Sequence, residues 1–128
     1  MSEIQHDVVV AAFPKNLGYK IEDWLITIGE DKAAGFVFIG GGGINGDAQC
    51  ILRSSGSKVG WLAYRTHLEL CKEFVDFLDS QAYDDGSNSF KYVAVGFGDV
   101  GQHIIASNSP KSNMQYFYKE IFDDKVGE

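Results

Sequence analysis

The first glycine-rich segment of the chain has the spacing of a dinucleotide-binding turn. Gly41, Gly43 and Gly46 spell G-x-G-x-x-G directly after the apolar run 36–39. A turn of that kind must lead into a helix whose N-terminal N–H groups face the pyrophosphate. Residues 47–53, however, lie between two turns, and that is the length of a strand. The Asn-Gly dipeptide that closes the segment is a strong hairpin signal, so the segment predicts a β-hairpin.

A second G-x-G-x-x-G, formed by Gly96, Gly98 and Gly101, follows another apolar run. Pro110 stops any helix soon after it, and the acidic ribose ligand expected about 20 residues further on would fall inside a later helix. We therefore interpret the segment as a glycine-rich β-turn with close backbone packing. The three glycines are candidate ligand-binding residues only under the alternative that the protein is a small enzyme or a nucleotide-binding domain.

Cysteine and histidine offer one local pair for nucleophilic catalysis. His67 and Cys71 are four residues apart, so their side chains meet on one face of a helix. Cys71 lies beyond the first helical turn and on the apolar stripe, which favours core packing over an activated thiolate. The other histidines and Cys50 form no spaced ligand motif, and the sequence predicts neither a metal site nor a cofactor.

Paired carboxylates are numerous, but they occur in predicted turns or near the chain end, where water solvates them. General acid–base catalysis needs carboxyl groups in a partly desolvated cleft. The pairs therefore predict a solvated surface, and the chain is expected to be non-enzymatic. They are Glu22-Asp23, Glu30-Asp31, Asp84-Asp85 and Asp123-Asp124.

One group of acidic residues is dense enough to recognise a partner. It follows the outer side of a predicted helix into the next loop, includes one tyrosine, and is called the acidic surface below. A patch of this sign would steer a basic protein and speed its association. Its residues are Glu69, Glu73, Asp76, Asp79, Tyr83, Asp84 and Asp85.

Charge and length limit the function classes. The chain has 11 basic and 18 acidic residues, a net charge of −7, and no basic cluster. Such a surface repels nucleic acid and anionic lipid, so neither is an expected partner. The N-terminus has the wrong charge for a secretory signal, and no apolar run is long enough to span a membrane. We expect a single cytoplasmic domain over residues 1–128, with frayed final residues.

Hydrophobic periodicity predicts mostly strands. The first region, 1–21, fits a strand or a helix, and its β-branched run favours a strand. Alternating patterns and turn residues predict short antiparallel strands along the rest of the chain. They fall at Val8–Val10, Trp24–Ile28, Phe36–Ile39, Gln49–Arg53, Lys58–Tyr64, Phe90–Phe97 and His103–Ala106.

Two helices are predicted from capping boxes followed by apolar stripes. A T-x-x-E box at Thr66–Glu69 opens the first helix, and an S-x-x-Q box at Ser112–Gln115 opens the second. The stripe of the first helix is His67, Cys71, Phe74, Val75, Leu78 and Ala82. The stripe of the second is Met114, Phe117, Tyr118, Ile121 and Phe122.

Together these elements predict an α+β fold. The expected architecture is an antiparallel meander of roughly five to seven strands with two amphipathic α-helices packed on one face. Several strands are apolar on both sides, and two helices cannot cover so large a sheet. Three arrangements remain open: the sheet curls on itself, the first segment covers the remainder, or a partner covers it.

In size, charge and lack of catalytic motifs, the chain is similar to small acidic bacterial proteins that neutralise a basic toxin or nuclease. That resemblance implies a non-enzymatic, acidic protein-binding module, such as an immunity-type inhibitor, with a basic protein as its partner. A small enzyme or ligand-binding domain that uses the Gly96–Gly101 turn is one alternative. The other is a structural subunit that self-associates into a homo-oligomer through its second sheet face.

Overall fold

The first strand forms where β-branched residues cluster. The computed structural model describes residues 3–40, 46–112 and 118–122, and β1 covers Gln5–Pro14. Its side chains alternate between buried and half-buried positions, because successive residues of a strand point to opposite faces. The strand ends at Pro14, since proline cannot donate a backbone hydrogen bond. The preference for a strand in this first region is confirmed.

Helices follow β1. Residues 15–18 predict a turn in the sequence, but Lys15–Leu17 form a short 3-10 helix, η1, which leads into α1 (Gly18–Ile28). Residues 29–32 also predict a turn, but Glu30–Ala33 form the one-turn helix α2. Gly29 separates α1 from α2 and has a φ of +93°, a conformation that glycine adopts readily at the end of a helix.

The predicted strand at Trp24–Ile28 is therefore wrong, because this segment belongs to α1. An alternating run of large apolar residues also fits a helix when some of them face solvent. Ile21 is fully buried and Trp24 packs against the core, whereas Ile26 is 79% exposed. Tertiary packing of the Trp24 side of the helix overrides the strand propensity of this segment.

The next two strands form the predicted antiparallel pair. β2 (Phe36–Ile39) pairs with β3 (Asp47–Leu52), with Val37 opposite Ile51. The predicted turn is Asn45-Gly46; Asn45 lies outside the described residues, and Gly46 has a φ of +73°. Because a strand and not a helix follows Gly46, this segment lacks the helix N-terminus that a dinucleotide site requires.

The long helix α3 covers Leu62–Ser80, which corrects two predictions. The predicted strand at Lys58–Tyr64 is wrong: Lys58 makes only an isolated bridge to Ile4, and the helix begins four residues later. The predicted capping box is also wrong, because Thr66 lies in the second helical turn. The apolar spacing extends back to Tyr64, so packing starts the helix earlier than the box suggested.

The predicted apolar stripe of this helix is largely confirmed. His67, Cys71, Phe74 and Leu78 are its buried residues. The last predicted member, Ala82, lies beyond the helix end and is exposed. The spacing of three and four residues places the four buried side chains on one face, as an amphipathic helix requires.

The last two strands, β4 (Lys91–Gly98) and β5 (His103–Ser107), form an antiparallel hairpin close to the predicted positions. The pairing is irregular between Ala94 and Val95, which marks a β-bulge. The turn after β4 is short, and β5 rather than a helix follows it.

The fold is α+β, with a five-stranded antiparallel sheet in the described residues, in the order β2-β3-β1-β4-β5. This order differs from the predicted meander, because β1 lies between β3 and β4. Val9 is opposite Leu52 on one side and Ala94 on the other. A strand that is apolar on both faces suits the centre of the sheet, where neighbouring strands surround it.

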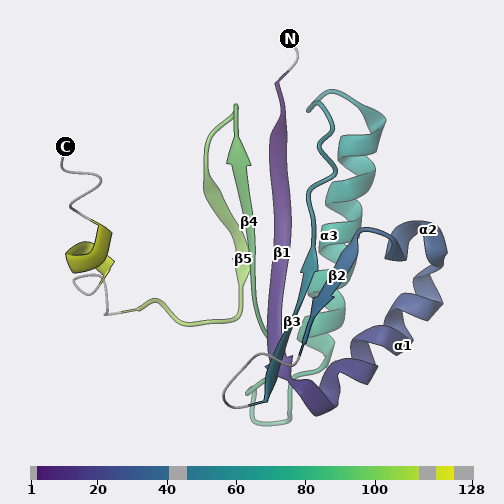
Figure 1. Ribbon diagram of the computed structural model, residues 1–128, viewed down its shortest axis with the longest axis vertical. Helices are drawn as coiled ribbons and strands as arrows, with labels where there is room; N and C mark the ends of the chain where they lie inside the picture. The colour runs from purple at the N-terminus through teal and green to yellow at the C-terminus, as the bar shows by residue number, and fades with distance from the viewer. Residues whose placement is uncertain (1–2, 41–45, 113–117, 123–128) are drawn as a thin grey trace.

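The core lies between one face of the sheet and the helices. Phe74 and Leu78 of α3 are fully buried against Val9 and the other inward residues of the strands. Trp24 of α1 stacks on Phe74 and Phe77, with ring centroids 5.5 and 5.0 Å apart. Figure 1 shows α3 running along the sheet and α1 next to the β2 edge.

The predicted C-terminal helix is described only in part. Residues 118–122 are helical, whereas Met114 and Phe117 and the predicted frayed end 123–128 lie outside the described residues. Ile121 and Phe122 are about half exposed, and Figure 1 places this segment beyond the β5 edge, apart from the sheet. The helix that packs beside α3 is therefore α1. None of the helices in the described ranges is long and apolar enough to cross a membrane.

Candidate functional site

Close packing surrounds two glycines of the Gly96–Gly101 turn. A Cβ on Gly96 would lie 2.7 Å from Asp7 Oδ1 and 2.9 Å from His103 Cε1, so no larger residue fits without a shift. Gly98 has a φ of +142°, and a Cβ there would lie 2.6 Å from the Ile4 carbonyl oxygen. These contacts account for Gly96 and Gly98 without a ligand, whereas Gly101 has no close contact and is distinguished by its φ of +129°. The helix that a phosphate-binding turn needs is replaced by β5.

The predicted contact between His67 and Cys71 is present and buried. Cys71 Sγ lies 3.5 Å from His67 Nε2, and the same nitrogen lies 2.7 Å from the main-chain oxygen of Asp7. Asp7 is itself only 1% exposed, and its Oδ2 has no hydrogen-bond partner among the described residues. The start of β1 thus places a carboxyl group, an imidazole and a thiol close together inside the protein.

This pair does not have the properties of a catalytic dyad. Burial, and then the nearby charge of Asp7, raise the pKa of the Cys71 thiol to about 12. The nucleophilic form of cysteine is the thiolate, which is scarce at neutral pH when the pKa is so high. Burial also raises the pKa of Cys50 to about 12. Both thiols therefore act as small apolar groups of the core.

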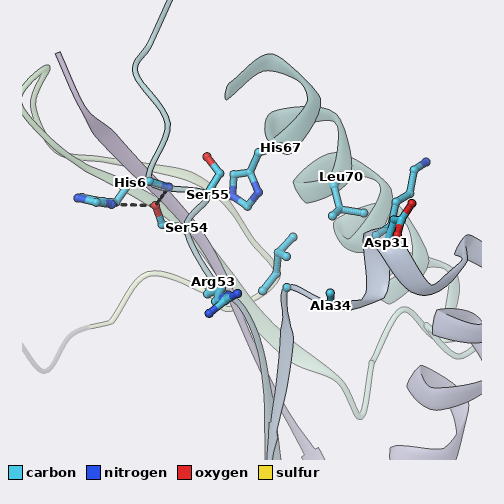
Figure 2. Close-up of a pocket in the computed structure, with 12 residues that line it drawn as sticks. His6, Asp31, Ala34, Arg53, Ser54, Ser55, His67 and Leu70 are labelled. Carbon is cyan, nitrogen blue, oxygen red and sulfur yellow. Dashed lines mark hydrogen bonds between the residues drawn. The ribbon is translucent and has the colours of Figure 1, made fainter. Parts of the chain in front are cut away.

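A cleft opens beside this buried group. It has a volume of about 680 Å³ and lies between α2, the end of β3 with its following loop, and α3. Figure 2 shows His67 pointing from α3 toward Ser55, with Arg53 and Ser54 on the strand side and Asp31 on the α2 side. Its polar lining residues are His6, Asp31, Lys32, Arg53, Ser54, Ser55 and His67.

Hydrogen bonds fix the strand side of the cleft. His6 Nδ1 lies 2.7 Å from Ser54 Oγ, and the Gly56 backbone N–H donates to the same oxygen at 3.0 Å. The Arg53 backbone N–H donates to the Gly35 carbonyl oxygen at 3.1 Å. These bonds hold the loop after β3 against the start of β1, so the wall of the cleft is ordered before any ligand binds.

The two basic side chains of the cleft differ in whether they already form an ion pair. Lys32 Nζ lies 3.4 Å from Glu73 Oε2, which neutralises this lysine at the rim. The Arg53 side chain is exposed and has no ion-pair partner among the described residues. Sequence patterns gave no sign of this site, because the pairing of β1 with β3 brings His6 to Ser54 across 48 residues of chain.

The acidic surface is a second candidate site, and most of its carboxylates already have partners. Asp76 pairs with Lys72 at 2.8 Å, and Asp79 Oδ1 accepts a hydrogen bond from the Tyr92 hydroxyl at 2.7 Å. Glu73 pairs with Lys32, and the side chain and backbone N–H of Ser87 lower the pKa of Asp85 by hydrogen bonding. In the described residues this leaves Glu69 and Asp84 without such a partner, while the Tyr83 hydroxyl bonds to Ser89 at 2.8 Å.

The third candidate site is the sheet face opposite the helices, called the open sheet face below. Residues directly opposite in a register share a face, so Val37, Ile51, Val10 and Val93 form one apolar row across four strands. A second row crosses the sheet from β1 to β5. The apolar residues of the face are Val8, Val10, Val37, Ile39, Ile51, Val93, Val95, Phe97 and Ile104.

The open sheet face is accessible to solvent at both edges and near one end. Ile104 is 71% exposed, and Phe97, Ile39 and Val37 are each about half exposed. The central residues are half-buried by their own neighbours. Of the three arrangements left open by the sequence, the first segment does not cover this face, because its residues 5–14 form the central strand of the sheet and the following α1 packs with α3.

Within the described residues, no group of three or more His, Cys, Asp and Glu side chains is placed to hold a metal ion. Comparisons of the chain with protein families, with curated proteins and with solved structures find no match. The candidate functional sites of the described residues are therefore the cleft, the acidic surface and the open sheet face.

Proposed function

We propose that this chain is a non-enzymatic protein-binding module and that the open sheet face is its main contact surface. The observation that carries the proposal is the continuity of apolar side chains across all five strands of that face. Large uncovered apolar patches on a protein surface mark sites of protein association. Contact with a partner would remove the most apolar surface from water at an edge residue such as Ile104, which is 71% exposed.

The charge of the protein suggests which partner would use this face. A net charge of −7 favours a basic protein, and the acidic surface on α3 would accelerate the encounter. Affinity would come from apolar contacts, because most carboxylates of the acidic surface are engaged within the chain. A basic toxin or nuclease fits this description, so an immunity-type inhibitor is the specific form of the proposal.

The chemistry of the candidate catalytic groups also favours a binding role. The Cys71 thiol has a raised pKa, and the second glycine motif has a packing explanation. The exposed carboxylates lie on the outside of α3 and in the loop after it, where water screens them. None of these groups meets the requirement for a desolvated, preorganised catalytic cleft.

The test is capture of partners from the native host with matched variants. Ile104→Lys puts a charge on the open sheet face, whereas Ile26→Lys makes the same change at an exposed position on α1. The proposal expects a partner that Ile26→Lys retains and Ile104→Lys loses, with both variants keeping the melting temperature of the wild type. Equal capture by both variants would exclude the open sheet face.

Self-association through the same face is the second candidate, favoured by the apolar character of the edge strands. Light scattering over a range of protein concentrations distinguishes it from binding of a different protein. A dimer that Ile104→Lys dissociates would assign the face to a second copy of the chain. A monomer at all concentrations would leave a different protein as the partner.

A further inference from the structure

We propose that the cleft between α2, the end of β3 and α3 binds a small molecule through an oxyanion group, either a carboxylate or a phosphate. This inference does not depend on the proposed protein-binding function, because it is argued from His67, Arg53 and Ser55, which are not among the apolar residues of the open sheet face. Its volume of about 680 Å³ is within the usual range for small-molecule sites.

The first observation is the state of His67. Its Nε2 lies 2.7 Å from the Asp7 carbonyl oxygen, which can only accept, so Nε2 carries the hydrogen. Nδ1 of the same ring has no hydrogen-bond partner among the described residues. His67 is only 8% exposed and lines the cleft. In the described residues the buried side-chain N or O atom without a partner is Asp7 Oδ2, not His67 Nδ1. Nδ1 is therefore accessible to solvent, and a molecule in the cleft can replace water as its partner.

The second observation is the charge of the strand side. Arg53 is exposed at the cleft and has no ion-pair partner among the described residues, whereas Lys32 is paired with Glu73. Guanidinium groups bind carboxylates and phosphates through two parallel hydrogen bonds. Ser55 Oγ accepts a bond from the Ser57 backbone N–H, which leaves its hydroxyl hydrogen to donate to a ligand.

The third observation sets the orientation of the ligand. Asp31 lies on the α2 side of the cleft and Arg53 on the strand side (Figure 2). An oxyanion therefore binds at the Arg53 end, away from the Asp31 carboxylate. The adjoining part of the ligand lies against His67 Nδ1, where a hydroxyl or amino group can donate a hydrogen bond to this ring nitrogen.

The test is an NMR titration of the full chain with two probes, inorganic phosphate and acetate, at constant ionic strength. Saturable shifts of the His67 and Arg53 signals with either probe support the site, and the probe that binds more tightly identifies the oxyanion class. Arg53→Met removes the charge and should weaken binding by roughly tenfold to a hundredfold. Arg65→Met, an exposed arginine on α3 that does not line the cleft, is the matched control and should have little effect.

Two results would overturn the proposal. One is the absence of saturable shifts at the cleft with both probes. The other is an equal effect of Arg53→Met and Arg65→Met, which would indicate non-specific attraction. Melting temperatures of both variants verify that the fold is intact, and both positions are exposed, so neither change disturbs the core.

Discussion

His67 Nε2 donates a hydrogen bond of 2.7 Å to the main-chain carbonyl oxygen of Asp7, 60 residues earlier in the chain. The bond ties α3 to β1, the central strand of the sheet, and it satisfies a carbonyl group of the buried face. It also fixes the imidazole so that Nδ1 is left for the cleft. One interaction thus contributes both to the packing of the fold and to the geometry of the candidate site.

Removal of this bond should destabilise the protein. His67→Phe keeps an aromatic ring but leaves the Asp7 carbonyl without a donor, and we expect the free energy of unfolding to fall by about 1–3 kcal/mol. His67→Gln retains a hydrogen-bond donor, so its free energy of unfolding should fall by less. Urea unfolding measures both, and Thr66→Ala, an exposed neighbour on α3, is the control. Equal stability of wild type and His67→Phe would contradict the assigned role.

The packing account of the second glycine motif predicts a contrast between two alanine substitutions. Gly96→Ala would force its new methyl group against Asp7 and His103, and should lower the free energy of unfolding by about 1–3 kcal/mol. Gly60→Ala is the control, because a Cβ at that position meets no atom within 4 Å. Thermal unfolding of both variants provides the measurement. If Gly96→Ala is as stable as Gly60→Ala, the glycine is not required by packing.

The assignment of residues 18–28 to a helix can be tested through the two tryptophans. Trp24 stacks on Phe74 and Phe77, so Trp24→Ala should lower the free energy of unfolding by about 3 kcal/mol. Trp61 is 55% exposed, and Trp61→Ala should lower it by less than about 1 kcal/mol. Similar losses in the two variants would argue against the packing of α1 on α3.

Stability should decrease in alkaline solution. Burial raises the thiol pKa values of Cys50 and Cys71 from 9.0 to about 12, so the folded state holds these protons after the unfolded chain has released them. The unfolded state then binds fewer protons, and the free energy of unfolding falls as the pH rises from about 9 toward about 12. Urea unfolding across this range is the measurement. Constant stability would show that the thiols titrate normally in the folded protein.

The acidic surface should affect the rate at which the protein associates with a basic partner. Glu69 and Asp84 have no intramolecular partner in the described residues, so Glu69→Lys with Asp84→Lys should slow association with a basic partner and leave the melting temperature nearly unchanged. Asp79→Lys should in addition lower the melting temperature, because it removes the bond to Tyr92. Stopped-flow association at two salt concentrations separates the electrostatic contribution. Unchanged rates would exclude the acidic surface from the encounter.

Local patterns were sufficient to predict the elements that depend on neighbours in sequence. The β2–β3 pair, the β4–β5 hairpin and the buried stripe of α3 follow from turn residues and from periods of two and of three to four residues. The segment Trp24–Ile28 fits both periods, and its contacts with Phe74 and Phe77 decide in favour of a helix. Those partners lie about fifty positions away, beyond the range of any local pattern.

The central position of β1 and the composition of the cleft could not be predicted for the same reason. No short segment contains the information that Val9 faces both Leu52 and Ala94. His6, Arg53 and His67 come to line one cleft only after the strands have paired in this order, and neither His6 nor Arg53 belongs to a motif. The acidic surface, in contrast, was visible in the sequence because its residues are close together on one helix and the loop that follows it.

The placement of β1 at the centre has a consequence for synthesis on the ribosome. This strand is translated before both of its neighbours, and β4, which pairs along most of its length, is translated last of the three. A nascent chain that has not reached residue 98 therefore carries a β-branched strand with one bare edge. Partial chains of this length should be the ones that aggregate or recruit chaperones. Once the β4 segment has left the ribosome, it can pair with β1, and the exposed strand edge is covered.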